Sequence, residues 1–373
     1  MWVARAAPSA TARASAPSER TSAPRPLAPL DPPSAPADNP TTPEKVELGK
    51  LLFFDGRLSG DTTTPCSGCH QPKLGWGDGM DLSHGYPGTH HWRNSQTVIN
   101  SAYYAKLFWA GESTSLEKQA EAAATGNVAG NGAIDLMEER LRQVPEYVDR
   151  FRKVFGTERP EIGDAWRAIA AYERTLIQTG TPLDRFLRGD ASALGPEAKR
   201  GKALFEGKAR CIQCHDGPLT SDEKYHNIGL PPSPTYETSP LVTITFRFQN
   251  YSRGVPEEVY RKSKLDLGLY YTTARDEDMA KFRTPSLRYL KYTAPYMHNG
   301  VFKTLEEVVA FYNRGGDPDP VKTYFGHATK SPLIRPLGLS KQEQADLVAF
   351  LLGMSGDEIV VDQPKLPPYG AEK

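Results

Sequence analysis

The sequence contains four cysteines, and all four stand in two copies of one motif, Cys-x-x-Cys-His. Two cysteines at this spacing can form two thioether bonds to one porphyrin, and the histidine that follows can bind its iron from below. The motif is therefore typical of c-type haem attachment, and two covalently bound haems are predicted. The predicted haem-binding residues are Cys66, Cys69 and the proximal ligand His70, and Cys211, Cys214 and the proximal ligand His215.

Two other chemistries use paired cysteines. Two Cys-x-x-Cys pairs can hold one structural zinc ion, but zinc does not require a histidine directly after both pairs. A thioredoxin-like redox motif uses a single pair and needs no duplicate. Covalent haem is the interpretation that uses every residue of both motifs.

Composition and charge exclude some partners. The chain has 373 residues, enough for two or three domains, and its 38% hydrophobic content is ordinary for a packed core. Lysine and arginine together number 45, as do aspartate and glutamate, so no overall field favours nucleic acid. No run of about 18 apolar residues exists, so we expect no membrane span.

Residues 1–40 are rich in alanine, serine and proline and poor in large apolar side chains, which predicts disorder. Bacteria attach c-type haem outside the cytoplasm, so the two motifs indicate a periplasmic protein. The N-terminus lacks the continuous apolar core of a secretory signal. We therefore expect either that the true start lies upstream or that the segment is a linker left after processing.

The two haem motifs lie in similar surroundings. Short amphipathic patterns at residues 48–53 and 200–205 precede them, and longer helical patterns at residues 162–178 and Lys341–Leu352 close each half. The last pattern begins with a capping box formed by Ser340 and Glu343. The predicted fold is mainly α, with two cytochrome c-like haem domains in tandem and long irregular loops.

Domain boundaries follow from this repeat. We expect a disordered segment at 1–40, an N-terminal domain at 41–180, a linker at 181–195, a C-terminal domain at 196–360 and a tail at 361–373. Loops as long as 71–91 and 216–275 are unusual, but a haem can replace much of an apolar core. Residues 241–248 alternate with period two, which indicates a strand.

The sixth iron ligands decide the function, because a haem with two protein ligands passes electrons whereas an open face can bind peroxide. Residues 304–316 predict a helix with a capping box at its start and two glycines after it. Tyr312 falls on the same face as Leu305, Val308 and Val309, so it should point inward. From the helix alone, a core tyrosine bonded to the backbone is the favoured interpretation.

These features together resemble the bacterial dihaem cytochrome c peroxidase and MauG family, over residues 44 to about 355. Besides both haem motifs, the resemblance is carried by Leu-Gly-Lys-Leu-Leu-Phe-Phe-Asp-Gly-Arg-Leu-Ser at 48–59, Arg-Asn-Ser at 93–95, Phe-Trp-Ala-Gly at 108–111, Phe-Arg-Thr-Pro-Ser-Leu-Arg at 282–288 and Ala-Pro-Tyr-Met-His-Asn-Gly at 294–300.

The resemblance implies that Tyr312 is the sixth ligand of the second haem, where classical peroxidases have methionine and MauG-like enzymes have tyrosine. A phenolate is a hard anionic donor that stabilises oxidised iron, so this haem should have a low reduction potential. By resemblance, Tyr312 favours MauG-like chemistry, in which hydrogen peroxide oxidises the protein and the oxidising equivalents act on an aromatic side chain of a partner protein.

The first haem is the implied peroxide site. A loop histidine covers its open face in classical peroxidases, and His84 stands at that place, with His90 and His91 as competitors. Three exposed loop histidines are the alternative reading. Peroxide cleavage needs a group that moves a proton, and the resemblance assigns Gln119 and a glutamate ten residues later. That later position is Ala129 here, and the possible substitutes are Glu112, Glu121 and Asp135.

The resemblance implies three further roles. Trp109 matches a tryptophan that lies between the haems and can relay electrons. Asn94, Thr293 and Pro295 match residues that hold a calcium ion, mostly through neutral oxygens. Tyr289 stands where the family usually has asparagine.

Three functions are therefore in competition. The first is a MauG-like oxidoreductase, and the second is a classical cytochrome c peroxidase that takes electrons from a small cytochrome or copper protein. The third is a non-catalytic electron carrier with two six-coordinate haems, which Ala129 supports to some degree. Cyanide binding to one haem would separate the enzymes from the carrier.

Overall fold

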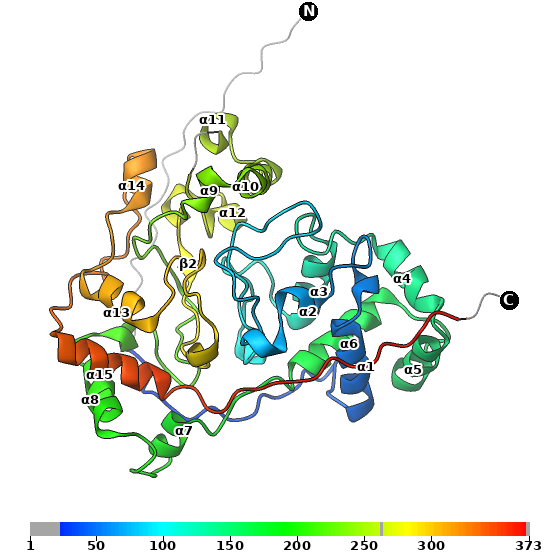
Figure 1. Ribbon diagram of the computed structural model, residues 1–373, viewed down its shortest axis with the longest axis horizontal. Helices are drawn as coiled ribbons and strands as arrows, with labels where there is room; N and C mark the ends of the chain where they lie inside the picture. The colour runs from blue at the N-terminus through cyan, green and yellow to red at the C-terminus, as the bar shows by residue number, and fades with distance from the viewer. Residues whose placement is uncertain (1–22, 262–263, 371–373) are drawn as a thin grey trace, which may run out of the picture.

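The computed structural model describes residues 23–261 and 264–370. In these ranges the chain is mainly helical, and its one sheet is the antiparallel pair of β1 (Tyr225–His226) and β2 (Phe282–Arg283). Long irregular segments connect the helices (Figure 1). The mainly α fold class with long loops is confirmed. In the same ranges, no helix has the length and hydropathy needed to cross a bilayer.

Figure 1 shows two groups of helices, one on each side of the molecule, with a third small group above. The first group comprises α1 (Pro43–Phe53), α2 (Cys66–Cys69), α3 (Leu116–Thr125), α4 (Ile134–Arg142), α5 (Pro145–Phe155) and α6 (Ile162–Glu173). The second comprises α7 (Pro182–Leu187), α8 (Pro196–Glu206), α13 (Leu305–Asn313) and α15 (Lys341–Leu352). The third comprises α9 (Thr235–Thr238), α10 (Pro240–Ser252), α11 (Glu257–Tyr260), α12 (Tyr270–Thr273) and α14 (Pro320–Phe325). Short 3-10 helices cover Gly56–Leu58, Pro72–Leu74, Ser101–Tyr103, Cys211–Gln213, Asp276–Asp278 and Leu290–Tyr292.

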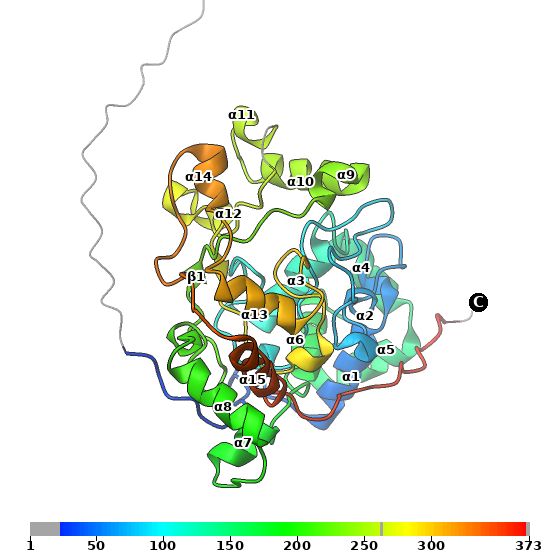
Figure 2. The same ribbon diagram turned by 60° about the vertical axis from the view of Figure 1, so that its left-hand side comes forward.

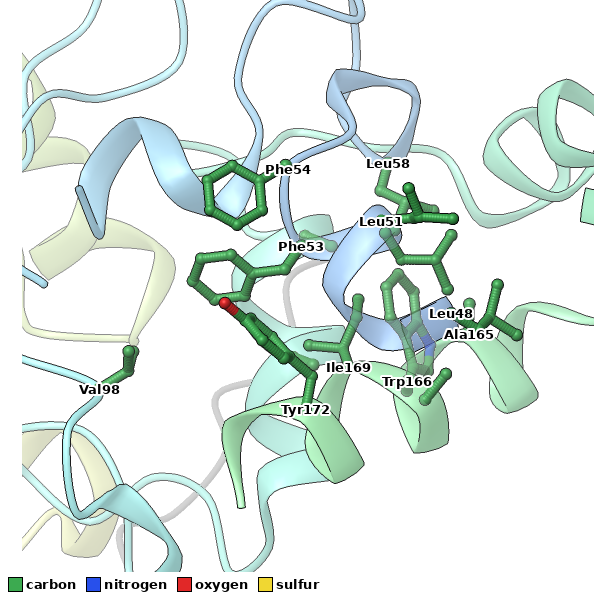
Figure 3. Packing of buried hydrophobic residues seen from close by; sticks show 14 of the residues in the cluster. Leu48, Leu51, Phe53, Phe54, Leu58, Val98, Ala165, Trp166, Ile169 and Tyr172 are labelled. Atoms are coloured by element: carbon green, nitrogen blue, oxygen red, sulfur yellow. The ribbon is translucent and has the colours of Figure 1, made fainter. Parts of the chain in front are cut away.

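The core of the first group forms where α1 crosses α6. Gly49 allows the close approach, because a Cβ atom there would lie 1.9 Å from the carbonyl oxygen of Ala168. Leu48, Phe53 and Tyr172 fill the space around this crossing (Figure 3). Helix α6 ends at Glu173, five residues before the predicted end of this helical pattern.

The second group repeats this crossing with α8 and α15. A Cβ atom on Gly201 would lie 2.0 Å from the carbonyl oxygen of Asp346, so glycine again permits backbone contact. The predicted capping box is present, since Ser340 and Glu343 exchange hydrogen bonds at the start of α15. The internal repeat read from the sequence therefore corresponds to two similar helix pairs.

The strand predicted at residues 241–248 is wrong, because this stretch lies inside α10. Val242 and Phe246 are buried one turn apart against the loop that carries Trp92, whereas Ile244 is 64% exposed. Helical packing of these two side chains outweighs the strand preference of valine, isoleucine and threonine. Pro240 also presets the first turn of the helix.

The N-terminal segment, residues 23–40, follows an extended path over the second group of helices (Figure 2). Leu27 joins the apolar cluster of that group, and Leu30 is 2% exposed. The Leu30 amide donates a hydrogen bond to Asp184. The disorder expected over residues 1–40 is therefore wrong for residues 23–40. The overall composition of this stretch is poor in apolar residues, but Leu27 and Leu30 are both buried. Residues 1–22 lie outside the described residues.

The C-terminal segment, residues 355–370, crosses in the opposite direction and packs on the first group (Figure 1). Its apolar residues Ile359, Val361 and Leu366 lie against the cluster around α1 and α6. Arg57 anchors the segment through a hydrogen bond to the Pro367 carbonyl. The predicted tail is therefore tied down as far as residue 370. The predicted linker at 181–195 contains α7, and the domain boundaries stay predictions.

Candidate haem-binding cavity

Both Cys-x-x-Cys-His motifs open into one cavity of about 860 Å³. Its lining includes Cys66, Cys69 and His70 at what we call the first end, and Cys211, Cys214 and His215 at what we call the second end. All four thiols are free, so they are available for thioether bonds. In the described ranges the four cysteines do not converge on one point, which argues against structural zinc.

His70 is oriented by the backbone. Its Nδ1 atom lies 3.1 Å from the Trp76 carbonyl oxygen, so the proton belongs on Nδ1 and Nε2 is left for a metal. Burial lowers the pKa of His70, which favours the neutral form that binds iron. The Trp76 indole donates in turn to the Ile359 carbonyl at 2.7 Å, so the C-terminal segment fixes the loop behind His70.

His215 has an equivalent arrangement. Its Nδ1 atom lies 3.2 Å from the Thr220 carbonyl oxygen, and burial lowers its pKa. The Thr220 hydroxyl accepts a hydrogen bond from the Leu287 amide, which ties this loop to the segment after β2. Asp216, the next residue, binds Arg25 of the N-terminal segment. Each candidate proximal ligand is thus supported by the chain end that crosses over from the other half.

Tyr312 lies in the last turn of α13 and lines the cavity near the second motif. The predicted capping box of Thr304 and Glu307 begins this helix. Burial, followed by the charges of Cys214 and Cys211, raises the pKa of the Tyr312 phenol. No residue of the described ranges forms a hydrogen bond with its hydroxyl, so the backbone-bonded alternative finds no support. Its oxygen is available as a ligand.

The structure shows which candidates for proton transfer line the cavity and which do not. Gln119 on α3 and Ala129 both line the cavity. Glu112 also lines it, but its Oε1 accepts a hydrogen bond from Arg93 and its Oε2 one from the Ala110 amide. The remaining substitutes considered, Glu121 and Asp135, are exposed and do not reach the cavity.

The sequence did not point to Glu173, which lines the cavity at the end of α6. It is 3% exposed, and its Oε2 atom has no hydrogen-bond partner. Burial raises the pKa of Glu173 to about 8. The available signal was its spacing, because Glu173 follows Ile169 by four residues on the inward face of a helix.

Of the loop histidines, His84 and His91 line the cavity and His90 does not. His84 is exposed, and its loop is held by Asp78, which accepts hydrogen bonds from the Ser83 hydroxyl and the His84 amide. The His91 ring stacks on Trp92 with 4.0 Å between centroids, and burial lowers its pKa to about 4. Both histidines stay candidates for the open face at the first end.

Trp109 lines the cavity into which both motifs open. Its indole nitrogen donates to the Asn94 carbonyl at 3.0 Å, and its carbonyl accepts from the Arg283 amide of β2. The His298 ring lies edge-on to the indole at 6.3 Å and stacks on Phe282 at 3.6 Å. This aromatic group therefore joins residues from the two halves of the chain in the wall of the cavity.

The three calcium candidates, Asn94, Thr293 and Pro295, also line the cavity. The side-chain nitrogen of Asn94 donates a hydrogen bond to the Met80 carbonyl, which leaves the side-chain oxygen of Asn94 available as a ligand. Throughout the described ranges, no donor bonds to that oxygen or to the Thr293 and Pro295 carbonyls. Such neutral oxygens suit calcium, and the site stays a prediction.

Tyr289 is fully buried in the cluster of the first helix group, although it belongs to the second half of the chain. Its hydroxyl accepts a hydrogen bond from the Ile359 amide at 2.8 Å, and its ring packs on Tyr292. Because Ile359 also binds Trp76, Tyr289 is linked to the loop that orients His70. This departure from the family pattern therefore supports the first motif from a distance.

The sequence was compared with those of known proteins to find the family to which the chain belongs. The sequence model of the di-haem cytochrome c peroxidase family matches residues 43–192. The cytochrome-c peroxidase IdrP1 of Denitromonas iodatirespirans is 56% identical over 327 residues, which cover 87% of this chain and 85% of the relative. The chain belongs to the di-haem cytochrome c peroxidase family.

Other members of this di-haem cytochrome c peroxidase family are more distant. The methylamine utilization protein MauG of Methylorubrum extorquens is 36% identical, over 87% of this chain and 82% of the relative. The crystal structure of a MauG-like protein associated with microbial copper homeostasis superposes with a TM-score of 0.73, at 30% identity, over 89% of this chain and 95% of that one.

Membership assigns the general activity. The protein is a peroxidase-type oxidoreductase, and haem c is the cofactor that its family implies. The free thiols of both motifs and the backbone contacts behind His70 and His215 fit haem c at both ends of the cavity.

Proposed function

We propose that the protein reduces hydrogen peroxide at the first end of the cavity with electrons that enter at the second end from a small cytochrome or copper protein. The observation that carries this proposal is that both motifs open into one cavity, which Trp109 also lines. The high identity to a relative named cytochrome-c peroxidase supports it. Because haem is attached outside the cytoplasm in bacteria, the periplasm is the proposed location.

Each motif would hold one haem through two thioethers and one proximal histidine, His70 or His215. Bound haem supplies the iron at which the O–O bond of peroxide is broken. The carbonyls of Trp76 and Thr220 keep the proximal histidines in one tautomer and one orientation. These contacts raise the basicity of the imidazole and thereby favour oxidised iron.

At the first end, the side chains would keep one face accessible to peroxide. The exposed His84 can cover or leave this face because its ring is not packed, and Gln119 offers an amide to orient the bound peroxide. Trp109 would relay electrons, since its indole is fixed by Asn94 between the two ends. A calcium ion on Asn94, Thr293 and Pro295 would hold the same contact together.

Oxidation of an aromatic side chain in a partner protein is the second candidate, and Tyr312 favours it. A tyrosine oxygen free of hydrogen bonds at the second end fits a hard anionic ligand, which makes the second haem hard to reduce. Such a haem suits the storage of oxidising equivalents better than the uptake of electrons.

The two candidates differ in how the fully oxidised, haem-loaded protein responds to one equivalent of hydrogen peroxide. Optical and paramagnetic resonance spectra would follow the reaction without reductant. A reaction that requires one haem to be reduced first supports the peroxidase. A long-lived state, two electrons more oxidised than the starting protein, supports oxidation of a partner. No reaction in either state would leave an electron carrier and contradict both candidates.

A further inference from the structure

Peroxide reduction consumes protons, and the cavity must supply them. One hydrogen peroxide takes up two electrons and two protons and gives two waters. A group that holds a proton at neutral pH and releases it during bond cleavage accelerates such a step. Gln119 and Ala129 cannot serve, because neither side chain titrates near neutral pH.

Two residues that line the cavity in the described ranges carry carboxyl groups, Glu112 and Glu173. Glu112 is already in use. The guanidinium of Arg93 lies 3.1 Å from one of its oxygens, and the Ala110 amide bonds to the other. Both oxygens of Glu112 are therefore occupied by hydrogen-bond donors of the protein.

Glu173 has the opposite surroundings. It is 3% exposed, its Oε2 atom lacks a partner, and no donor fixes its charge. An ionised carboxyl in this position would be costly, so the protonated form is favoured. Burial accordingly raises the pKa of Glu173 to about 8, even though the cation of Arg174 acts in the other direction.

The charged groups around Glu173 are few. Arg174 is bound to Glu117 of α3 at 2.6 Å, which weakens its effect on the neighbouring carboxyl. Tyr172, on the same helix, and Cys66, at the first motif, are the other titratable groups on which Glu173 acts. The pKa of the Cys66 thiol is raised to about 12, first by burial and then by the negative charge of Glu173. Glu173 therefore lies at the first end of the cavity.

Two further polar groups near the end of α6 lack protein partners. The side-chain nitrogen of Asn100 and the hydroxyl of Ser101 are buried without hydrogen bonds. Asn100 is bonded through its backbone to Leu176, which places this pair beside the turn that follows Glu173. Ser101 also lines the cavity. Buried polar atoms of this kind are usually satisfied by water, so the region after the end of α6 can hold water molecules.

We propose that Glu173 stores the proton that peroxide takes up when its O–O bond breaks at the first end of the cavity. The carboxyl gives its proton to the oxygen that leaves as water and becomes a carboxylate. A proton from solvent that enters the cavity then restores the carboxyl. The second proton comes from solvent, and both electrons come from the redox partner. This inference rests on the proposed function and assigns its proton source.

The test compares Glu173→Gln with Glu121→Gln, the same change at an exposed site outside the cavity. The rate of peroxide reaction would be measured by stopped flow from pH 5 to 10. Wild type and Glu121→Gln should react fast at low pH and slow down through a midpoint near 8. Glu173→Gln should be slower by about 100-fold below that pH, without this midpoint. Glu173→Asp, which keeps an acid, should recover part of the rate.

Infrared spectroscopy gives a readout that does not depend on turnover. Wild type and Glu121→Gln should show the carbonyl band of one protonated carboxyl group at pH 7 that disappears by pH 10, and Glu173→Gln should lack it. An unchanged rate and pH profile in Glu173→Gln would overturn the proposal, as would an ionised Glu173 at pH 7. A wild-type protein that is inert to peroxide would instead overturn the proposed function, and the role of Glu173 with it.

Discussion

Arg25 binds Asp216 across 191 residues of sequence, with 2.6 Å between the guanidinium nitrogen and the carboxylate oxygen. Asp216 directly follows His215, so the N-terminal segment supports the loop of the second motif. Trp76 and Ile359 make the corresponding contact behind His70 with the C-terminal segment. Each end of the chain therefore crosses to the other half and supports one candidate proximal ligand.

Replacing Arg25 should disturb the second haem alone. Arg25→Ala removes the ion pair and the contact with the Ser221 carbonyl. The free energy of unfolding should fall by no more than about 1 kcal/mol, because Arg25 is largely exposed. Paramagnetic resonance should show a changed signal for one haem. Arg188→Ala, which breaks an exposed pair with Asp31, is the matched control and should change neither signal.

Tyr289→Phe tests the support of the first motif. The variant leaves the Ile359 amide without its acceptor, which should cost about 1 kcal/mol of unfolding free energy. Because Ile359 also holds Trp76, the signal of the first haem should shift while that of the second does not. Tyr369→Phe, an exposed change in the same segment, serves as control. Identical spectra of Tyr289→Phe and wild type would show that this link has no influence on His70.

Tyr312→Met should raise the reduction potential of the second haem by on the order of 100 mV, because a thioether stabilises oxidised iron less than a phenolate does. A redox titration followed by absorbance measures both haems at once. The exposed change Tyr324→Met is the control. If both potentials stay unchanged in Tyr312→Met, Tyr312 is not a ligand and the MauG-like candidate loses its support.

The buried pair of Arg93 and Asp266 predicts a loss of stability in acid. Burial alone would raise the pKa of Asp266, but Arg93 at 2.6 Å outweighs it and holds the pKa below the ordinary 3.8. A carboxyl with a lowered folded-state pKa stabilises the protein fully above the unfolded-state value. Its contribution is then lost as the pH falls through the folded-state value. Thermal unfolding should therefore show a decline that begins below about pH 4.

Asp266→Asn should remove this acid dependence and cost about 3 kcal/mol at neutral pH, because the buried guanidinium of Arg93 loses its closer carboxylate and keeps the pair with Glu112. Asp276→Asn, at an exposed position, should do neither. Chemical denaturation at pH 7 and at about pH 2 measures both effects, because the contribution of Asp266 is lost only below the unfolded-state pKa. A difference between wild type and Asp266→Asn that stays the same at the two values would contradict this assignment.

The sequence predicted the parts of the site that have a local signal. The two Cys-x-x-Cys-His motifs contain their own candidate iron ligands. The capped helix that carries Tyr312 could be predicted from the spacing of its apolar residues and from the two glycines after it. Trp76, Ile359 and Glu173 could not be found in this way, because their roles depend on contacts between segments far apart in the chain. The strand prediction for residues 241–248 was wrong for a related reason. The packing of Phe246 against distant residues favours the helix there.

The central claim is that peroxide is reduced with electrons from a small redox protein. The most direct measurement is the consumption of hydrogen peroxide by the haem-loaded protein with a reduced small cytochrome as donor. We expect one peroxide to be consumed for every two cytochromes oxidised. We also expect turnover to be lost when Cys66 and Cys69, or Cys211 and Cys214, are replaced by alanine. Cytochrome oxidation that does not depend on peroxide, or turnover that survives without the second motif, would contradict it.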